Sequence, residues 1–242
     1  MAAFVNMAAI GVTAFQSNAL GPLDSVAHPL EPGNYRGEVW TGDARLGSFL
    51  LEVADKGDGE QIEVDLCSVG PKSPHSAEAY RSGPMEGHPV YAVFHCDKGA
   101  MGLYVILRDR AGRGVLFDSR ALQAGDYYIL TPVRPGTWSM ETGKSGRGQI
   151  LVKDPKPSRK PRASAAGAMV KVGDKGFTPD VVELVAGDGV AFEVAAKDVA
   201  IKVTLDDKGG TFTKGRRPVG IRVPGRNGGE TRPRAGGRKS AA

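Results

Sequence analysis

The chain has 242 residues, which is enough for one large domain or two small ones. Its 34 glycines and 16 prolines, together with short runs rich in Val, Thr, Tyr and Phe, exclude a helical bundle and favour a turn-rich all-β fold. The net charge of +5 is unevenly placed, because residues 207–242 carry ten Lys/Arg against two acids and residues 153–162 carry five against one. The remaining chain is therefore acidic, and the overall basic character does not indicate a nucleic-acid-binding fold.

Residues 1–19 form an apolar lead whose Ser17-x-Ala19 end fits the small-residue pattern of a signal-peptidase site. The segment lacks a positively charged start and is too short for a membrane-spanning helix, so no membrane span is expected. We interpret it as a signal peptide or an apolar lead. A periplasmic or secreted location is the expectation, with a cytoplasmic one as the alternative.

Residues 30–153 are predicted to form a β-sandwich module. Turn signals such as Asp55-Lys-Gly-Asp-Gly59 separate short apolar runs, a spacing typical of sandwiches and barrels. Gln61–Leu66 alternates polar and apolar residues, as a strand with one buried face does. The expected strands are Tyr35–Trp40, Gly47–Val53, Gln61–Cys67, Val90–Cys96, Leu103–Leu107, Val115–Phe117, Tyr127–Thr131, Thr137–Met140 and Gln149–Val152.

Residues 154–168 combine prolines with Lys and Arg and contain no large apolar side chain, which predicts a linker. A second, short β module is expected over 169–224, followed by a basic disordered tail over 225–242. The predicted fold class is all-β, with two Greek-key-like β-sandwich modules joined by a Pro/Lys/Arg-rich linker and a basic disordered C-terminal tail.

Two stretches carry a family resemblance. Phe177-Thr-Pro is followed by two apolar runs around an Ala-Gly-Asp-Gly turn and by Ala200–Leu205. Upstream, the chain reads Leu116-Phe-Asp-Ser, Leu122-Gln-Ala-Gly-Asp, Val133-Arg-Pro-Gly-Thr-Trp and Gly148-Gln-Ile-Leu-Val. The first stretch resembles the opening half of a cupredoxin, the β-sandwich that carries blue copper, and the second resembles its closing half. The resemblance covers roughly 75 residues in two blocks and implies a cupredoxin-like scaffold.

The resemblance also implies where copper ligands would lie. The first His would open the strand at Ala200-Ile201, and the Cys, second His and Met would follow Trp138. This chain has no His at the first place and only Met140 at the second. Because a type-1 centre needs two imidazoles and a thiolate, a conventional site is not expected there.

A different segment provides an alternative ligand set. His95, Cys96 and Met101 lie within seven residues, with His75 and His88 upstream. Adjacent residues on a strand point to opposite faces, which argues against His95 and Cys96 sharing one metal. The chain has one other cysteine, Cys67. Three interpretations of Cys96 remain open: it is a copper ligand, it forms a disulfide with Cys67, or it is an inert core thiol.

Catalytic motifs are absent from the sequence. It contains no Walker loop, His-Glu-x-x-His or Cys-x-x-Cys, so we expect no enzymatic activity and no cofactor, with copper as the alternative. The C-terminal residues offer charge for an anionic surface or polymer, without aromatic residues for base stacking. The candidate tail residues are Arg216, Arg217, Arg222, Arg226, Arg232, Arg234, Arg238 and Lys239.

These observations favour a non-enzymatic, exported, cupredoxin-like binding or structural module that interacts with a protein partner and lacks a conventional copper site. The first alternative is a copper-binding electron-transfer or copper-handling protein that uses the His95/Cys96/Met101 segment. The second alternative is an assembly or shell protein with a nucleic-acid-facing basic tail.

Overall fold

The structure is a computed structural model and describes residues 11–57, 59, 61–69, 79–83, 89–97, 101–143, 146–155 and 167–206. Across these residues it contains strands and turns and no helix, which confirms the all-β prediction. No helix in the described part of the chain is long and apolar enough to cross a membrane. The C-terminal tail candidates from Arg216 to Lys239 lie outside the described residues.

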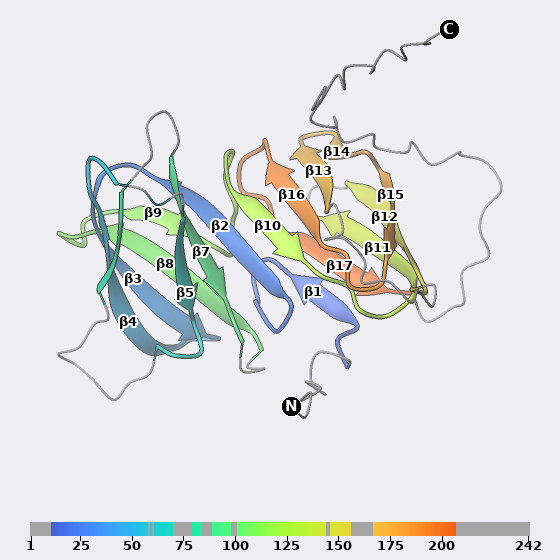
Figure 1. Cartoon of the computed structure of the whole chain (residues 1–242), viewed down its shortest axis with the longest axis horizontal. Coiled ribbons are helices and arrows are strands. Elements are labelled where there is room, and N and C mark those ends of the chain that lie inside the picture. The colour runs from blue at the N-terminus through green and yellow to red at the C-terminus, as the bar shows by residue number, and fades with distance from the viewer. Residues whose placement is uncertain are drawn as a thin grey trace, which may run out of the picture.

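Three sheets make up the fold (Figure 1). The central sheet has seven strands in the order β14 (Gly176–Thr178), β13 (Ala168–Gly173), β16 (Val190–Val194), β10 (Tyr127–Leu130), β2 (Asp24–Leu30), β7 (Val90–His95) and β5 (Gln61–Asp65). Sheet A has the order β1 (Ala14–Gln16), β17 (Ile201–Leu205), β11 (Gly136–Thr142), β12 (Arg147–Lys153) and β15 (Val181–Val185). Sheet B has the order β6 (Ala79–Ser82), β4 (Ala44–Val53), β3 (Gly33–Thr41), β8 (Leu103–Asp109) and β9 (Val115–Asp118).

One face of the central sheet is fully buried. Strand pairing aligns a row of apolar side chains across six strands, and each of them has no exposed surface. Burial of such side chains is the main favourable contribution to folding, at roughly 1.5–3 kcal/mol for each large one. The row consists of Val64, Phe94, Val26, Tyr128, Phe192 and Val170.

Sheets A and B cover this buried face. From sheet B, Phe49 and Phe117 contact Phe94 with ring centroids 6.0 Å and 5.8 Å away. Sheet A contributes Trp138 and Met140, and all of these side chains belong to one buried apolar cluster. The molecule therefore has a single continuous core beneath the central sheet.

Strands from the two sides of the predicted linker pair with one another. β10 pairs with β16, β11 with β17, and β12 with β15. Residues 127–153, which the sequence groups with the first module, thus share their sheets with residues 168–205. The turn at Ala186-Gly-Asp188 connects β15 in sheet A to β16 in the central sheet, and Gly187 has a φ of 91° that favours glycine there.

The second half of the apolar lead is part of the core. β1 pairs antiparallel with β17, and Phe15 packs against Trp138 at a centroid distance of 5.4 Å. Ser17 donates its N–H to the Ile201 carbonyl and accepts the Ile201 N–H at its hydroxyl. Within this half of the lead, Val12 and Phe15 are buried in the core, and cleavage after Ala19 would remove the strand that packs on Trp138.

A buried carboxyl group connects this lead to the central sheet. Asp24, which is 5% exposed, accepts hydrogen bonds from the Gly21 N–H at 2.8 Å and from the Tyr128 hydroxyl at 2.8 Å. Burial raises the pKa of Asp24 from 3.8 to about 7, and the hydrogen bonds only partly oppose it. The carboxyl group is therefore protonated in the folded protein under mildly acidic conditions.

Asp24→Asn is expected to remove a pH dependence of stability. Between the unfolded pKa of 3.8 and the folded value of about 7, only the unfolded state loses this proton, so native stability falls as pH rises. The loss amounts to about 4 kcal/mol by neutral pH. Urea unfolding at pH 4, 5.5 and 7.5 should show the wild-type protein losing stability relative to Asp24→Asn, whereas the exposed-site control Glu141→Gln should track the wild type. A constant difference between wild type and Asp24→Asn would contradict the assignment.

Candidate functional site

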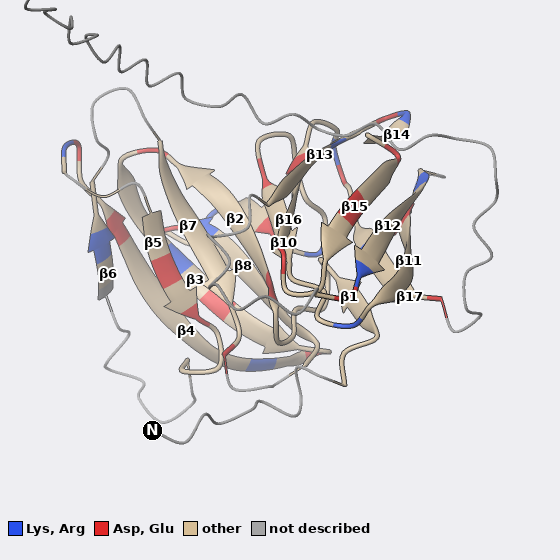
Figure 2. Ribbon diagram, turned by 45° about the vertical axis from the view of Figure 1, so that its right-hand side comes forward, with Lys and Arg blue, Asp and Glu red and all other residues tan. Residues whose placement is uncertain are grey.

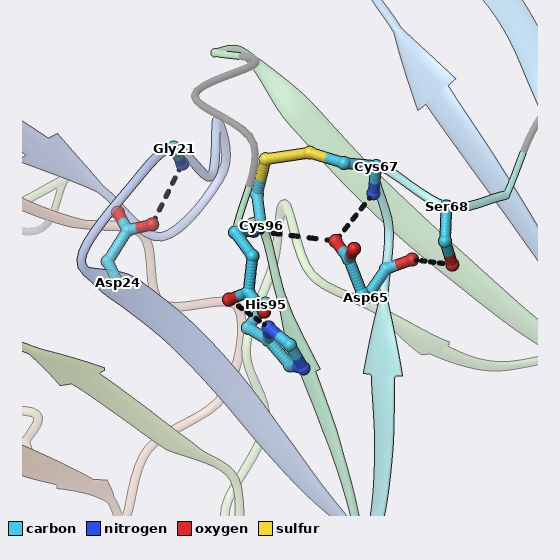
Figure 3. The surroundings of a disulfide bond; sticks show 8 residues. Gly21, Asp24, Asp65, Cys67, Ser68, His95 and Cys96 are labelled. Carbon is cyan, nitrogen blue, oxygen red and sulfur yellow. Dashed lines mark hydrogen bonds and ion pairs between the residues drawn. A yellow bond between two sulfur atoms is a disulfide. The ribbon is translucent and has the colours of Figure 1, made fainter. Parts of the chain in front are cut away.

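The two cysteines form a disulfide at one end of the central sheet (Figure 3). Cys67 and Cys96 directly follow the parallel neighbours β5 and β7, and their Cα atoms are 5.5 Å apart, a normal distance for a disulfide. The Asp65 carboxylate accepts the Cys67 N–H at 2.9 Å and orders this corner. The predicted disulfide is confirmed.

The alternative copper segment does not assemble a thiolate ligand set. The sulfur of Cys96 is bonded to Cys67, and a disulfide sulfur is not the thiolate that a blue-copper site requires. His95 places Nδ1 2.9 Å from the Asp97 carboxylate, and the Met101 side chain is 64% exposed. The predicted ligands His75 and His88 lie outside the described residues.

Asp65, Cys67 and Cys96 bring one carboxylate oxygen and two sulfurs within 4.8 Å of one another. With both sulfurs in the disulfide, the carboxylate is the one charged donor of this group. The group therefore does not fit a metal in the oxidised protein.

The two places where the resemblance expects copper ligands do lie side by side. Thr142 at the end of β11 pairs with Ile201 at the start of β17, and the Gly143 N–H donates to the Ala200 carbonyl at 3.4 Å. However, Thr142, Ala200 and Ile201 offer no imidazole or thiolate there, and Met140 is fully buried in the core. Residues 139–148 and 199–202 contain no His or Cys, so this region lacks the donors for a type-1 copper centre.

The outward face of the central sheet is the most distinctive surface of the described structure. Pairing aligns one row across all seven strands, from Glu63 on β5 through Ala27 and Tyr127 to Lys171 on β13 and Thr178 on β14. The middle of this face carries apolar and aromatic side chains where an uncovered sheet face usually carries polar ones. We call it the open-face patch, and it consists of Ala27, Tyr91, Val93, Tyr127, Ile129 and Met169.

Two tyrosines form the centre of the open-face patch. Tyr91 on β7 and Tyr127 on β10 reach across β2, with ring centroids 5.7 Å apart and edge-to-face geometry. They leave Ala27 between them only 5% exposed. Partial burial, with smaller contributions from Tyr91 and Glu193, raises the pKa of Tyr127 above its usual value of 10.0. Tyr127 therefore stays neutral at physiological pH, and the two rings offer apolar area with hydroxyl groups.

Charged side chains surround this apolar centre. Glu63 lies on β5, where Figure 2 shows acidic positions, and Glu193 and Lys171 lie on β16 and β13. An apolar centre with a charged rim is the usual composition of a protein-binding surface. Sequence reasoning missed this patch because its residues come from β2, β7, β10 and β13, and only strand pairing brings them together.

Comparisons with protein-family models, curated proteins and solved structures found no match. Function is therefore argued from the residues of this chain.

Removing the disulfide is expected to lower stability by about 3.5 kcal/mol, because it closes a loop with a sequence separation of 29 residues. Thiol titration of the unreduced, denatured protein should find no free thiol, and reduction should release two. Urea unfolding with and without reductant gives the stability change. The Cys67→Ala/Cys96→Ala variant should match the reduced protein and be insensitive to reductant, and two thiols before reduction would contradict the bond.

Proposed function

We propose that this chain is a non-enzymatic, exported binding module that presents the open-face patch of its central sheet to a protein partner. The patch is the observation that carries the proposal. Its apolar and aromatic side chains line a sheet face with a charged rim. Such a surface stabilises association by removing apolar area from water.

The strand pairing supports a cupredoxin-like scaffold for this module. The upstream block resembles a closing half and the downstream block an opening half, and they pair through β10–β16, β11–β17 and β12–β15. We infer that together they form one cupredoxin-like sandwich in which the closing half precedes the opening half along the chain. The remaining strands of sheet B and the central sheet would then form the other Greek-key-like sandwich.

The chemistry of the scaffold supports binding over electron transfer. The region between Thr142 and Ala200, where the resemblance expects copper, has no imidazole or thiolate, and Cys96 is in a disulfide. The disulfide also supports export, because such bonds persist in oxidising compartments. The basic tail remains a proposed contact with an anionic surface or polymer.

Addition of Cu(II) to the oxidised protein is expected to produce no thiolate-to-copper charge-transfer band in the visible spectrum, because no thiolate is present. The matched control is the Cys67→Ser/Cys96→Ser double variant, which has no cysteine and should give the same spectrum. An intense visible band in the wild-type protein that is lost in the double variant would overturn the proposal in favour of the copper-binding alternative.

Hydroxyl-radical footprinting of the dilute protein tests whether the patch is accessible. Tyr127 and Met169 should be modified, whereas their buried counterparts Tyr128 and Met140 should be protected, since both have no exposed surface. Mass spectrometry of the peptides gives the modification rates. Protection of Tyr127 and Met169 equal to that of Tyr128 and Met140 would show that the face is covered within a single chain and would overturn the proposed function.

A further inference from the structure

The shape of the open-face patch favours another β-sheet as its occupant. Adjacent strands in a sheet twist with a fixed hand, so a seven-stranded face is curved. A second sheet with the same twist packs against such a face with its mean strand direction within about 30° of the first. A copy of this chain carries a face with matching curvature.

The area of the face is enough for a weak contact. With strands about 4.8 Å apart and a rise of about 3.3 Å per residue, pairing over about five residues gives a face of roughly 30 Å by 17 Å. Two such faces in contact would cover roughly 1,000 Å² in projection, which is the size of a weak or transient interface and lies below the roughly 1,200 Å² of stable specific ones. This size predicts a concentration-dependent dimer.

The charged rim is complementary to itself in one orientation. β10 is the middle strand of the seven, so a twofold axis parallel to the strands near β10 places β5 and β7 of one copy over β14 and β13 of the other. Glu63 on β5 then comes within reach of the long Lys171 side chain on β13 of the second copy. An axis perpendicular to the strands would instead bring the two Glu63 side chains together, where like charges repel.

We propose that two copies of this chain associate through their open-face patches, with a twofold axis parallel to the strands near β10. Tyr127 of each copy lies next to the axis, and the Glu63–Lys171 contacts at the rim set the orientation. This inference rests on the proposed function, because it names the partner that occupies the same surface.

Sedimentation equilibrium of the full-length oxidised chain over a wide concentration range tests the dimer. The wild type should shift from monomer to dimer mass, and footprinting should show Tyr127 and Met169 becoming protected over the same range. Ile129→Lys should remain monomeric. Ile129 lies outward between Ser25 and Ala191, so a lysine there extends into solvent. A melting temperature equal to that of the wild type, measured at a concentration where the wild type is monomeric, confirms that the variant is folded.

A charge swap tests the orientation of the axis. Glu63→Lys or Lys171→Glu alone should weaken association by about tenfold, because each is repeated twice in the dimer and replaces an attraction with a repulsion. The Glu63→Lys/Lys171→Glu double variant should recover to within about threefold of the wild-type dissociation constant. Failure of this rescue would overturn the proposed orientation.

Two results would overturn the association through this patch: a wild-type protein that is monomeric at every concentration, or a dimer that persists in Ile129→Lys. A third result would also overturn it, namely an association that high salt abolishes and Ile129→Lys leaves unchanged. Such an association would come from the charged tail. If the protein stays monomeric and Tyr127 and Met169 are still modified, the dimer is excluded and the proposed function stands. If these residues are protected in the dilute monomer, the dimer and the proposed function are both excluded.

Discussion

The pairing of β2 with β10 is the contact on which the rest of the structure depends. It joins strands that are about a hundred residues apart and converts two groups of strands into one seven-stranded sheet. Two polar contacts join β2 and β10 on the buried face of the sheet. The Tyr128 hydroxyl donates a hydrogen bond to the Asp24 carboxyl group, and His28 Nδ1 lies 2.7 Å from the Asp126 carboxylate. Without this pairing both strands would present open edges, which are prone to pair with other chains.

The same pairing creates the open-face patch. Because side chains alternate between the faces of a strand, the register that buries Val26 and Tyr128 also turns Ala27 and Tyr127 outward. A shift of one residue would exchange the two sets and expose the core. The open-face patch is therefore coupled to the stability of the fold, and the buried Asp24 connects both to the N-terminal lead.

Local residue patterns predicted several features correctly. The alternation in Gln61–Leu66 identified a strand with one buried face, and the cysteines at the ends of two strands made the disulfide one of three open interpretations. The patterns also identified the strands on either side of the Ala-Gly-Asp turn. What the patterns did not reveal is that these two strands, β15 and β16, belong to different sheets, because a turn residue specifies the local backbone and not the next pairing partner. The patch escaped detection for the same reason, since Tyr91 and Tyr127 approach each other only across β2.

The sequence by itself determined the all-β character, the positions of many strands, the acidic body with its basic tail, and the absence of copper donors around Ala200 and Met140. These features depend on composition, alternation and residue identity, which act over a few neighbouring residues. The tertiary structure alone decided that residues 14–16 complete a sheet, that strands on both sides of residues 154–168 pair, and that the central sheet keeps an apolar face outward. Those outcomes depend on contacts between residues far apart in the chain, where hydrogen-bond register and burial select one pairing among many that the local patterns allow.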